Sequence, residues 1–175
     1  MKSPKSRSFW NRFLPDFYVN ELSEIPLELL REKKVRGLIL DLDNTLVAWN
    51  RYDLSPGVIS WVKKAKEMGF LVFIVSNALE ERVQYFSQAL EVPGISKAQK
   101  PRRSALRNAI ERMGLELHEV AVVGDQILTD VWGGNRLGVY TVLVRPLTSR
   151  EFFLTCLGRK FEKLVLRRLT PHDRC

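Results

Sequence analysis

This 175-residue chain is poor in cysteine and contains no long apolar run. Its two cysteines, Cys156 and Cys175, indicate reduced thiols and an intracellular setting. No run approaches the ~18 apolar residues that span a bilayer, and the basic, aromatic N-terminus lacks the ~7–15-residue apolar centre of a secretory signal. We therefore expect a protein that is not secreted and that lies in the cytoplasm or, if the N-terminus acts as a transit segment, on an organellar matrix side.

Positive charge is concentrated at the two ends of the chain. Of the formal net charge of +8, residues 1–36 carry +3, residues 147–175 carry +4 and residues 37–146 carry only +1. The ends are therefore candidates for contact with an anionic membrane surface, or with a nucleic acid as a less favoured partner. The alternative interpretation is that the basic residues at the ends are ordinary solubilising surface charge. We expect a basic, aromatic N-terminal extension (1–36), a globular core (37–146) and a basic C-terminal helix (147–175).

Short apolar runs alternate with amphipathic stretches through the core. The four clear runs are rich in Val and Ile and are almost continuously apolar, as expected for strands buried on both faces of a parallel sheet. They lie at residues 35–41, 70–76, 120–125 and 139–144, with a weak fifth at 92–96. Ser55-Pro56, an Asn77–Glu80 capping box and Pro101 open helices between them. This order predicts an α/β fold, a doubly wound, Rossmann-like parallel sheet with helices on both faces.

Polar side chains stand where these runs end. They are Asp41 and Asp43 after the first run, Ser76 and Asn77 after the second, Asp125 and Asp130 after the third, and Lys100 just before the helix that begins at Pro101. Ligands of such sheets bind at the carboxyl ends of the strands, so these groups are expected on one rim. Taken singly, most of these residues would be interpreted as helix caps, turn residues or solvated charges.

Together, these groups suit metal-assisted phosphate chemistry. Clustered carboxylates are what Mg²⁺ prefers, and an ammonium and a hydroxyl beside that cation bind phosphate. One free carboxylate can attack phosphorus, while a second protonates the leaving group and then deprotonates water. The metal and the lysine would offset the repulsion between the carboxylate and the phosphate.

Four segments resemble the motifs of the haloacid dehalogenase-like (HAD) superfamily. They are DLDNT (41–45), SN (76–77), KP (100–101) and GDQILTD (124–130), and the match covers about residues 37–146. The resemblance implies that Asp41 is the nucleophile and Asp43 the general acid/base. Thr45 would orient the site rather than react.

The same resemblance assigns the binding residues. It implies that Ser76, Asn77 and Lys100 bind the phosphoryl group, that Asp125 binds Mg²⁺, and that Asp130 supports that site. The implied metal ligands are Asp41, the backbone carbonyl of Asp43, and Asp125.

HAD phosphatases commonly carry a cap domain after the first or second motif, but this chain has no room for one. The 34 residues of 42–75 are mostly taken up by the predicted helix and second strand, and the 22 residues of 78–99 also leave too little space. A short flap near 48–55 remains. An uncovered rim suits a bulky substrate such as a protein, a nucleic acid end or a lipid head group.

The C-terminal segment shows an amphipathic pattern between a Thr148–Glu151 capping box and Pro171. One face is apolar: Leu154, Leu157, Phe161, Leu164 and Val165. The basic residues Arg159, Lys160, Lys163 and Arg167 lie towards other faces. Such a helix is typical of interfacial helices on membranes. The alternative is that it packs on the core or on a partner subunit.

More narrowly, the chain is similar to the capless IIIA-type HAD phosphatases, which include a phosphatidylglycerophosphate phosphatase. That resemblance implies hydrolysis of phosphatidylglycerophosphate to phosphatidylglycerol by a peripheral membrane enzyme. Two other classes stay open: a phosphatase acting on a nucleic acid end or a phosphoprotein, and a non-catalytic regulatory module in which Asp41 only accepts a phosphoryl group. The sequence does not indicate an oligomeric state.

Overall fold

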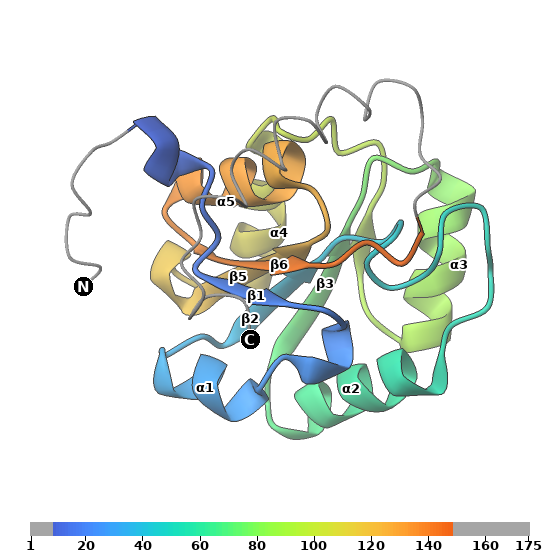
Figure 1. The fold of residues 1–175 in the computed structure, drawn as a ribbon. Coiled ribbons are helices and arrows are strands. Elements are labelled where there is room, and N and C mark those ends of the chain that lie inside the picture. Colours follow the sequence, from blue (N-terminus) through green and yellow to red (C-terminus); the bar gives the residue numbers. More distant parts are fainter. Residues whose placement is uncertain (1–8, 149–175) are drawn as a thin grey trace.

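The computed structural model describes residues 9–148 and shows one six-stranded, entirely parallel sheet (Figure 1). The strand order is β1-β6-β5-β2-β3-β4. The strands are β1 (Phe17–Val19), β2 (Gly37–Leu40), β3 (Leu71–Val75), β4 (Gly94–Ile95), β5 (Val120–Gly124) and β6 (Tyr140–Val144). The chain therefore folds as the predicted doubly wound α/β domain, with β2 at the centre between β5 and β3.

Helices cover both faces of this sheet. They are α1 (Leu27–Glu32), α2 (Pro56–Glu67), α3 (Glu80–Leu90), α4 (Ser104–Met113) and α5 (Trp132–Leu137). Three 3-10 turns, η1 (Phe9–Arg12), η2 (Leu22–Glu24) and η3 (Leu117–Glu119), and a π-helical turn, η4 (Ile127–Val131), complete the described elements. In Figure 1, α1 and α2 lie below the sheet, whereas α4 and α5 lie above it.

The apolar core is divided by the sheet, because successive strand residues point to opposite faces. Leu38 and Leu40 of β2 pack with α1, α2 and α3, whereas Ile39 packs with α4 and α5. All four residues of β2 and all five of β5 are buried. This double burial explains why the predicted strands are continuously apolar rather than alternating.

The predicted N-terminal extension needs correction, because part of residues 1–36 belongs to the sheet and the core. The edge strand β1 pairs in parallel with β6, with Phe17 opposite Val142. Leu27 and Leu30 of α1 are buried against the sheet. The compact core therefore extends at least back to Phe17 rather than starting at residue 37.

The predicted helix caps are confirmed in part. Ser55 caps α2 as predicted, with its hydroxyl accepting the Val58 N–H at 3.3 Å. The predicted Asn77–Glu80 capping box is wrong, since α3 begins at Glu80 after Leu79, which makes no side-chain capping bond. Asn77 is held elsewhere by hydrogen bonds to Lys100.

No cap domain interrupts residues 9–148, as predicted. Only a flap, α2 and β3 separate Asp41 from Ser76, and only α3 and β4 lie between Asn77 and Lys100. No helix in this part of the chain is both long and apolar enough to cross a membrane. Most of the predicted C-terminal helix at 147–175 lies outside the described residues.

The edge strand leads to a first prediction. Asp16 Oδ2 accepts hydrogen bonds from the backbone N–H of the buried Thr141 at 3.0 Å and from its hydroxyl at 3.1 Å. Asp16→Ala should therefore lower the free energy of unfolding by about 1–3 kcal/mol, since buried donors lose an acceptor. Urea denaturation measures this change. Asp53→Ala, at an exposed position of the flap, should change stability by less than about 0.5 kcal/mol; equal effects would contradict the assignment.

Candidate active site

The predicted site residues meet at the carboxyl edge of the sheet. Asp41 follows β2, Ser76 follows β3 and Asp125 follows β5, and these strands are neighbours in one parallel sheet. Asp130 comes from η4, just beyond β5, and Lys100 lies shortly before α4. All five residues are buried. The structure thus brings together groups that are far apart in the sequence.

A buried lysine joins two of the carboxylates. Lys100 Nζ lies 2.5 Å from Asp41 Oδ1 and 2.6 Å from Asp130 Oδ1. The Lys100 side chain is only 4% exposed, so these ion pairs are poorly screened by water. Removing Lys100 would leave the buried carboxylates of Asp41 and Asp130 without a compensating cation.

Asn77 fixes the backbone of Lys100. Its side-chain Oδ1 accepts the Lys100 N–H at 2.8 Å, and its Nδ2 donates to the Lys100 carbonyl at 3.4 Å. The amide therefore holds both backbone polar groups of the lysine that reaches the cluster. The contacts of Asn77 identify it as a residue that positions Lys100; the predicted direct contact of Asn77 with phosphate stays a prediction.

Three buried carboxylates could hold a metal ion. Oxygen atoms of Asp41, Asp125 and Asp130 all lie within 4.8 Å of one another. With Lys100 as the cation beside them, three carboxylates and one ammonium give a formal charge of −2. A divalent cation would balance that charge, and hard oxygen ligands suit Mg²⁺. The residues therefore fit the predicted metal, with Asp130 as an additional candidate ligand.

Burial and this charge imbalance together set the electrostatics of the cluster. Burial, reinforced by the charge of Asp130 and opposed by Lys100, raises the pKa of Asp41 to about 7. Burial alone would lower the pKa of Lys100, but the charges of Asp130 and Asp41 outweigh it and raise that pKa. Lys100 therefore stays protonated at neutral pH, and its single positive charge balances only part of the negative charge of the carboxylates.

Smaller contacts hold the remaining predicted residues. The hydroxyl of the buried Thr45 donates to Asp125 Oδ1 at 3.4 Å, consistent with an orienting role. Ser76 Oγ accepts the Ala78 N–H at 3.2 Å, which leaves its own proton to be donated into the site.

The other oxygen of Asp130 is also restrained. Asp130 Oδ2 accepts the Gln126 N–H at 3.2 Å and the Thr129 hydroxyl at 3.2 Å. Thr129 lies in the π-helical turn that follows β5, and Gln126 immediately precedes that turn. These hydrogen bonds therefore orient the Asp130 carboxylate towards Lys100.

Asp43 faces a partner that the sequence did not reveal. Two N–H groups of Arg82, Nε and Nη2, donate to Asp43 Oδ1 at 2.9 and 2.7 Å. Arg82 lies in the first turn of α3, and its position five residues after the second motif carries no distinctive pattern. The predicted binding of metal by the Asp43 backbone carbonyl stays a prediction.

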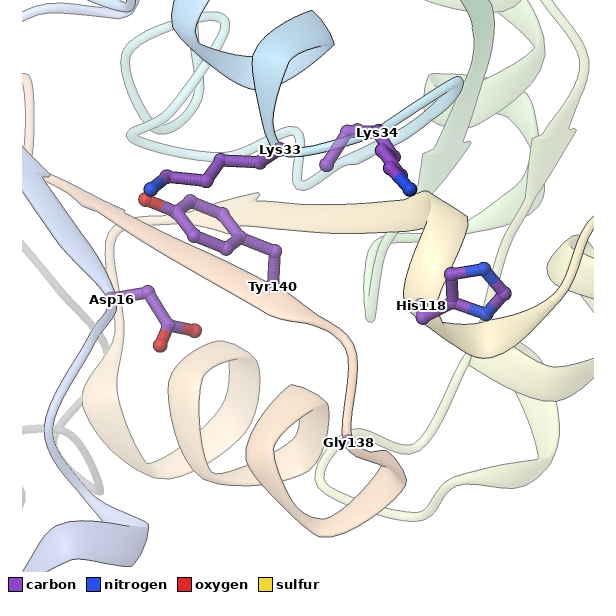
Figure 2. A pocket seen from close by; sticks show the side chains of 7 residues that line it. Asp16, Lys33, Lys34, His118, Gly138 and Tyr140 are labelled. Atoms are coloured by element: carbon purple, nitrogen blue, oxygen red, sulfur yellow. The ribbon is translucent and has the colours of Figure 1, made fainter. Parts of the chain in front are cut away.

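A separate hollow of about 750 Å³ lies at the opposite edge of the sheet (Figure 2). Lys33 and Lys34 precede β2, His118 precedes β5, and Tyr140 opens β6. Figure 2 shows the Lys33 ammonium beside the Tyr140 hydroxyl. Burial, followed by the charge of Asp16, raises the pKa of Tyr140. None of the predicted site residues lines this hollow, so it is distinct from the acidic cluster.

Comparison with known proteins places this arrangement in a family. A model described as "haloacid dehalogenase-like hydrolase" matches residues 6–138. A probable phosphatase, YqeG of Bacillus subtilis, is 46% identical over 88% of this chain and 90% of its own length. Phosphatidylglycerophosphate phosphatase 1 of Arabidopsis thaliana is 30% identical over 94% of this chain, which spans about half (49%) of that protein's length.

Solved structures show the same fold at low sequence identity. The cobalt-bound deoxy-D-mannose-octulosonate 8-phosphate phosphatase of Haemophilus influenzae is 13% identical, with a TM-score of 0.54 over 77% of this chain and 89% of that chain. An uncharacterised protein of Listeria monocytogenes is 18% identical, with a TM-score of 0.55 over 67% and 85%. These likenesses concern the fold alone.

The close packing of Asp130 leads to a second prediction. A Cβ on Gly124 would lie 2.3 Å from the carboxyl carbon of Asp130, so one of them must move. Gly124→Ala should push Asp130 away from Lys100 and lower the free energy of unfolding by on the order of 3 kcal/mol. The matched control is Gly57→Ala on α2, where the nearest atom is 3.9 Å away. Urea denaturation should find the control unchanged or more stable; a harmless Gly124→Ala would contradict the packing.

Proposed function

Because the chain belongs to the haloacid dehalogenase-like hydrolases, we propose that its acidic cluster is the active site of a Mg²⁺-dependent phosphatase. It would hydrolyse phosphomonoesters through an aspartyl-phosphate. One observation carries the proposal: a buried carboxylate, Asp41, touches a buried ammonium, Lys100, within a cluster of formal charge −2. An oxyanion nucleophile, a phosphate-binding cation and a place for a divalent ion then lie together.

Chemistry would begin at Asp41. One carboxylate oxygen attacks phosphorus and forms the acyl phosphate, while the bond from phosphorus to the leaving alcohol oxygen breaks. Asp43, two residues along the chain, gives its proton to that oxygen. In the second half, Asp43 takes a proton from water, the water oxygen attacks phosphorus, and inorganic phosphate leaves with Asp41 restored.

The surrounding residues bind and orient. Lys100 donates to the phosphoryl oxygens and to Asp41, and Ser76 donates its hydroxyl proton to the same group. Asn77 keeps Lys100 in place through both of its backbone polar groups. These donors balance part of the negative charge that a phosphate brings to a rim of carboxylates.

Asp41, Asp125 and the Asp43 backbone carbonyl would hold Mg²⁺, with Asp130 beside them. When bound, the ion supplies charge neutralisation that lets a carboxylate approach a phosphate. Thr45 restrains Asp125 from the buried side.

We propose phosphatidylglycerophosphate as the substrate, giving phosphatidylglycerol. The phosphatidylglycerophosphate phosphatase activity named for the Arabidopsis relative supports this choice, as does the open rim. Large apolar side chains are exposed close to the site: Trp49, Tyr52, Leu79, Tyr85 and Leu147. Tyr52 and Tyr85 meet edge to face at 5.1 Å, and Leu147 N–H donates to the Asn44 carbonyl beside the catalytic segment. Tyr and Trp favour membrane–water interfaces, so this rim suits a head group held in a bilayer.

The nucleophile gives a third prediction. Asp41→Asn should abolish turnover in a folded protein, because an amide cannot form the acyl phosphate. Asp43→Asn should lose roughly 10²–10⁴-fold in kcat, as is typical for the loss of a general acid–base group. Phosphate release from an aryl phosphate with Mg²⁺ present measures both effects, with circular dichroism as the control for folding. Near-normal activity in folded Asp41→Asn would sink the mechanism.

The proposed action on a membrane lipid gives a fourth prediction. Deleting residues 151–175 should preserve hydrolysis of a soluble aryl phosphate, since every proposed site residue lies within 41–130. The same deletion should reduce sedimentation with anionic liposomes and hydrolysis of phosphatidylglycerophosphate in them, since each basic residue near such a surface contributes about 1 kcal/mol.

Two controls decide this prediction. Neutral liposomes should bind the full chain less well than anionic ones, and high salt should weaken the anionic binding. Equal losses on the soluble and liposomal substrates would show that the segment is structural. Faster hydrolysis of a phosphorylated oligonucleotide or phosphopeptide than of the lipid would contradict the proposed substrate.

A further inference from the structure

We propose that Arg82 forms a second anion-binding subsite beside the phosphoryl site, which binds a negatively charged group on the leaving alcohol. The ligand class is a phosphomonoester whose leaving alcohol also carries a phosphodiester, as a glycerophospholipid head group can. This inference rests on the proposed function, because the acid role of Asp43 is what places the leaving alcohol next to Arg82.

The position of Arg82 follows from its contact with Asp43. Nε and Nη2 both point at one oxygen, Oδ1, at 2.9 and 2.7 Å. A proton that Asp43 gives up goes to the leaving oxygen, so that oxygen must lie against the same carboxylate. An anion a few bonds beyond the leaving oxygen is then within reach of the guanidinium.

The guanidinium is held in place before any ligand arrives. Nη1 donates to the Arg51 carbonyl at 2.7 Å, and Nη2 approaches the Ala48 carbonyl at 3.5 Å. The charged end lies 5.0 Å from the Tyr52 ring centre and 5.1 Å from that of Phe86. Contacts from the flap and from α3 thus fix a planar donor group, which lowers the entropy lost on binding an anion.

The pair can also be reached from solvent. The side chain of Arg82 is 13% exposed and that of Asp43 is 23% exposed, whereas that of Lys100 is 4% exposed. A ligand at the rim can therefore touch Arg82 without moving the buried cluster. The Arg82 ion pair lies on the outer side of the site, where a leaving alcohol would emerge.

Charge explains why such a substrate needs Arg82. Lys100 is already shared between Asp41 and Asp130, and a phosphomonoester brings further negative charge to that cluster. A second anion near Asp43 would be repelled by these carboxylates unless a cation accompanied it. The guanidinium of Arg82 supplies that cation, and of its five N–H donors the contacts with Asp43, Arg51 and Ala48 engage four, which leaves one on Nη1 for a phosphodiester oxygen.

The competing explanation is that Arg82 only ties the flap to α3. In that case the loss of Arg82 would weaken the binding of every ligand equally. A subsite for a second anion instead predicts a selective loss, which ligands with one and two phosphates can reveal.

The test measures binding rather than turnover and uses the full chain carrying Asp41→Asn, with Mg²⁺ present. Calorimetry compares glycerol 3-phosphate with glycerophosphoglycerol phosphate, the deacylated head group. The Asp41→Asn parent should bind the two-phosphate ligand, glycerophosphoglycerol phosphate, at least tenfold more tightly than glycerol 3-phosphate. Adding Arg82→Gln should weaken the binding of the two-phosphate ligand at least tenfold, or about 1.4 kcal/mol. The same change should raise the Kd of glycerol 3-phosphate by a several-fold smaller factor.

Two further variants make the comparison specific. Arg82→Lys keeps the charge but not the planar guanidinium and its contacts, and should recover only part of the preference. Arg107→Gln, an exposed arginine on α4, makes the same charge change away from the rim and should match the parent. Thermal unfolding confirms that each variant is folded.

The outcomes separate this inference from the proposed function. Equal weakening of both ligands by Arg82→Gln, or a parent with no preference for the second phosphate, would overturn the subsite while leaving the phosphatase proposal standing. A parent that binds neither ligand would overturn both. A preference that disappears with Arg82→Gln and survives Arg107→Gln establishes the subsite.

Discussion

The site depends on one interaction, the ammonium of Lys100 buried between Asp41 and Asp130. Carboxylates from two segments could not be buried so close together without a cation, because each would lose hydration and repel the other. The lysine solves only part of this problem, since three carboxylates still exceed one ammonium by two charges. Burial, reinforced by the charge of Asp130, raises the pKa of Asp41, and the remaining negative charge is what a divalent ion would balance.

The fold supplies the geometry that this interaction requires. The central strand β2 ends at Asp41 between β3 and β5, so side chains after three neighbouring strands converge. Asn77 fixes the backbone of Lys100, and the π-helical turn fixes Asp130. Outside this buried layer, Arg82 links Asp43 to the flap. The inner layer thus suits the scissile phosphate, and the outer layer suits the leaving alcohol.

Much of this arrangement could be predicted from the sequence, because parallel strands buried on both faces are continuously apolar and end in conspicuous polar residues. The acidic residues and Lys100 were placed correctly on one rim for that reason. The three-residue strand β1 was missed because so short an edge element shows no alternation. The helix-capping role expected of Asn77 was wrong, since its hydrogen bonds run to a residue 23 positions away. Arg82 gave no local signal, because its partners Asp43 and Arg51 meet it only in three dimensions.

The most direct test of the central claim is Mg²⁺ binding to the metal-free protein by titration calorimetry, with Asp125→Asn for comparison. The charge balance predicts one Mg²⁺ per chain, a higher melting temperature with the ion bound, and binding at least roughly tenfold weaker, about 1.4 kcal/mol, once Asp125 is neutral. Phosphatase activity should disappear in EDTA and return with Mg²⁺. Full activity in EDTA, together with no Mg²⁺ uptake by the folded protein, would contradict the account.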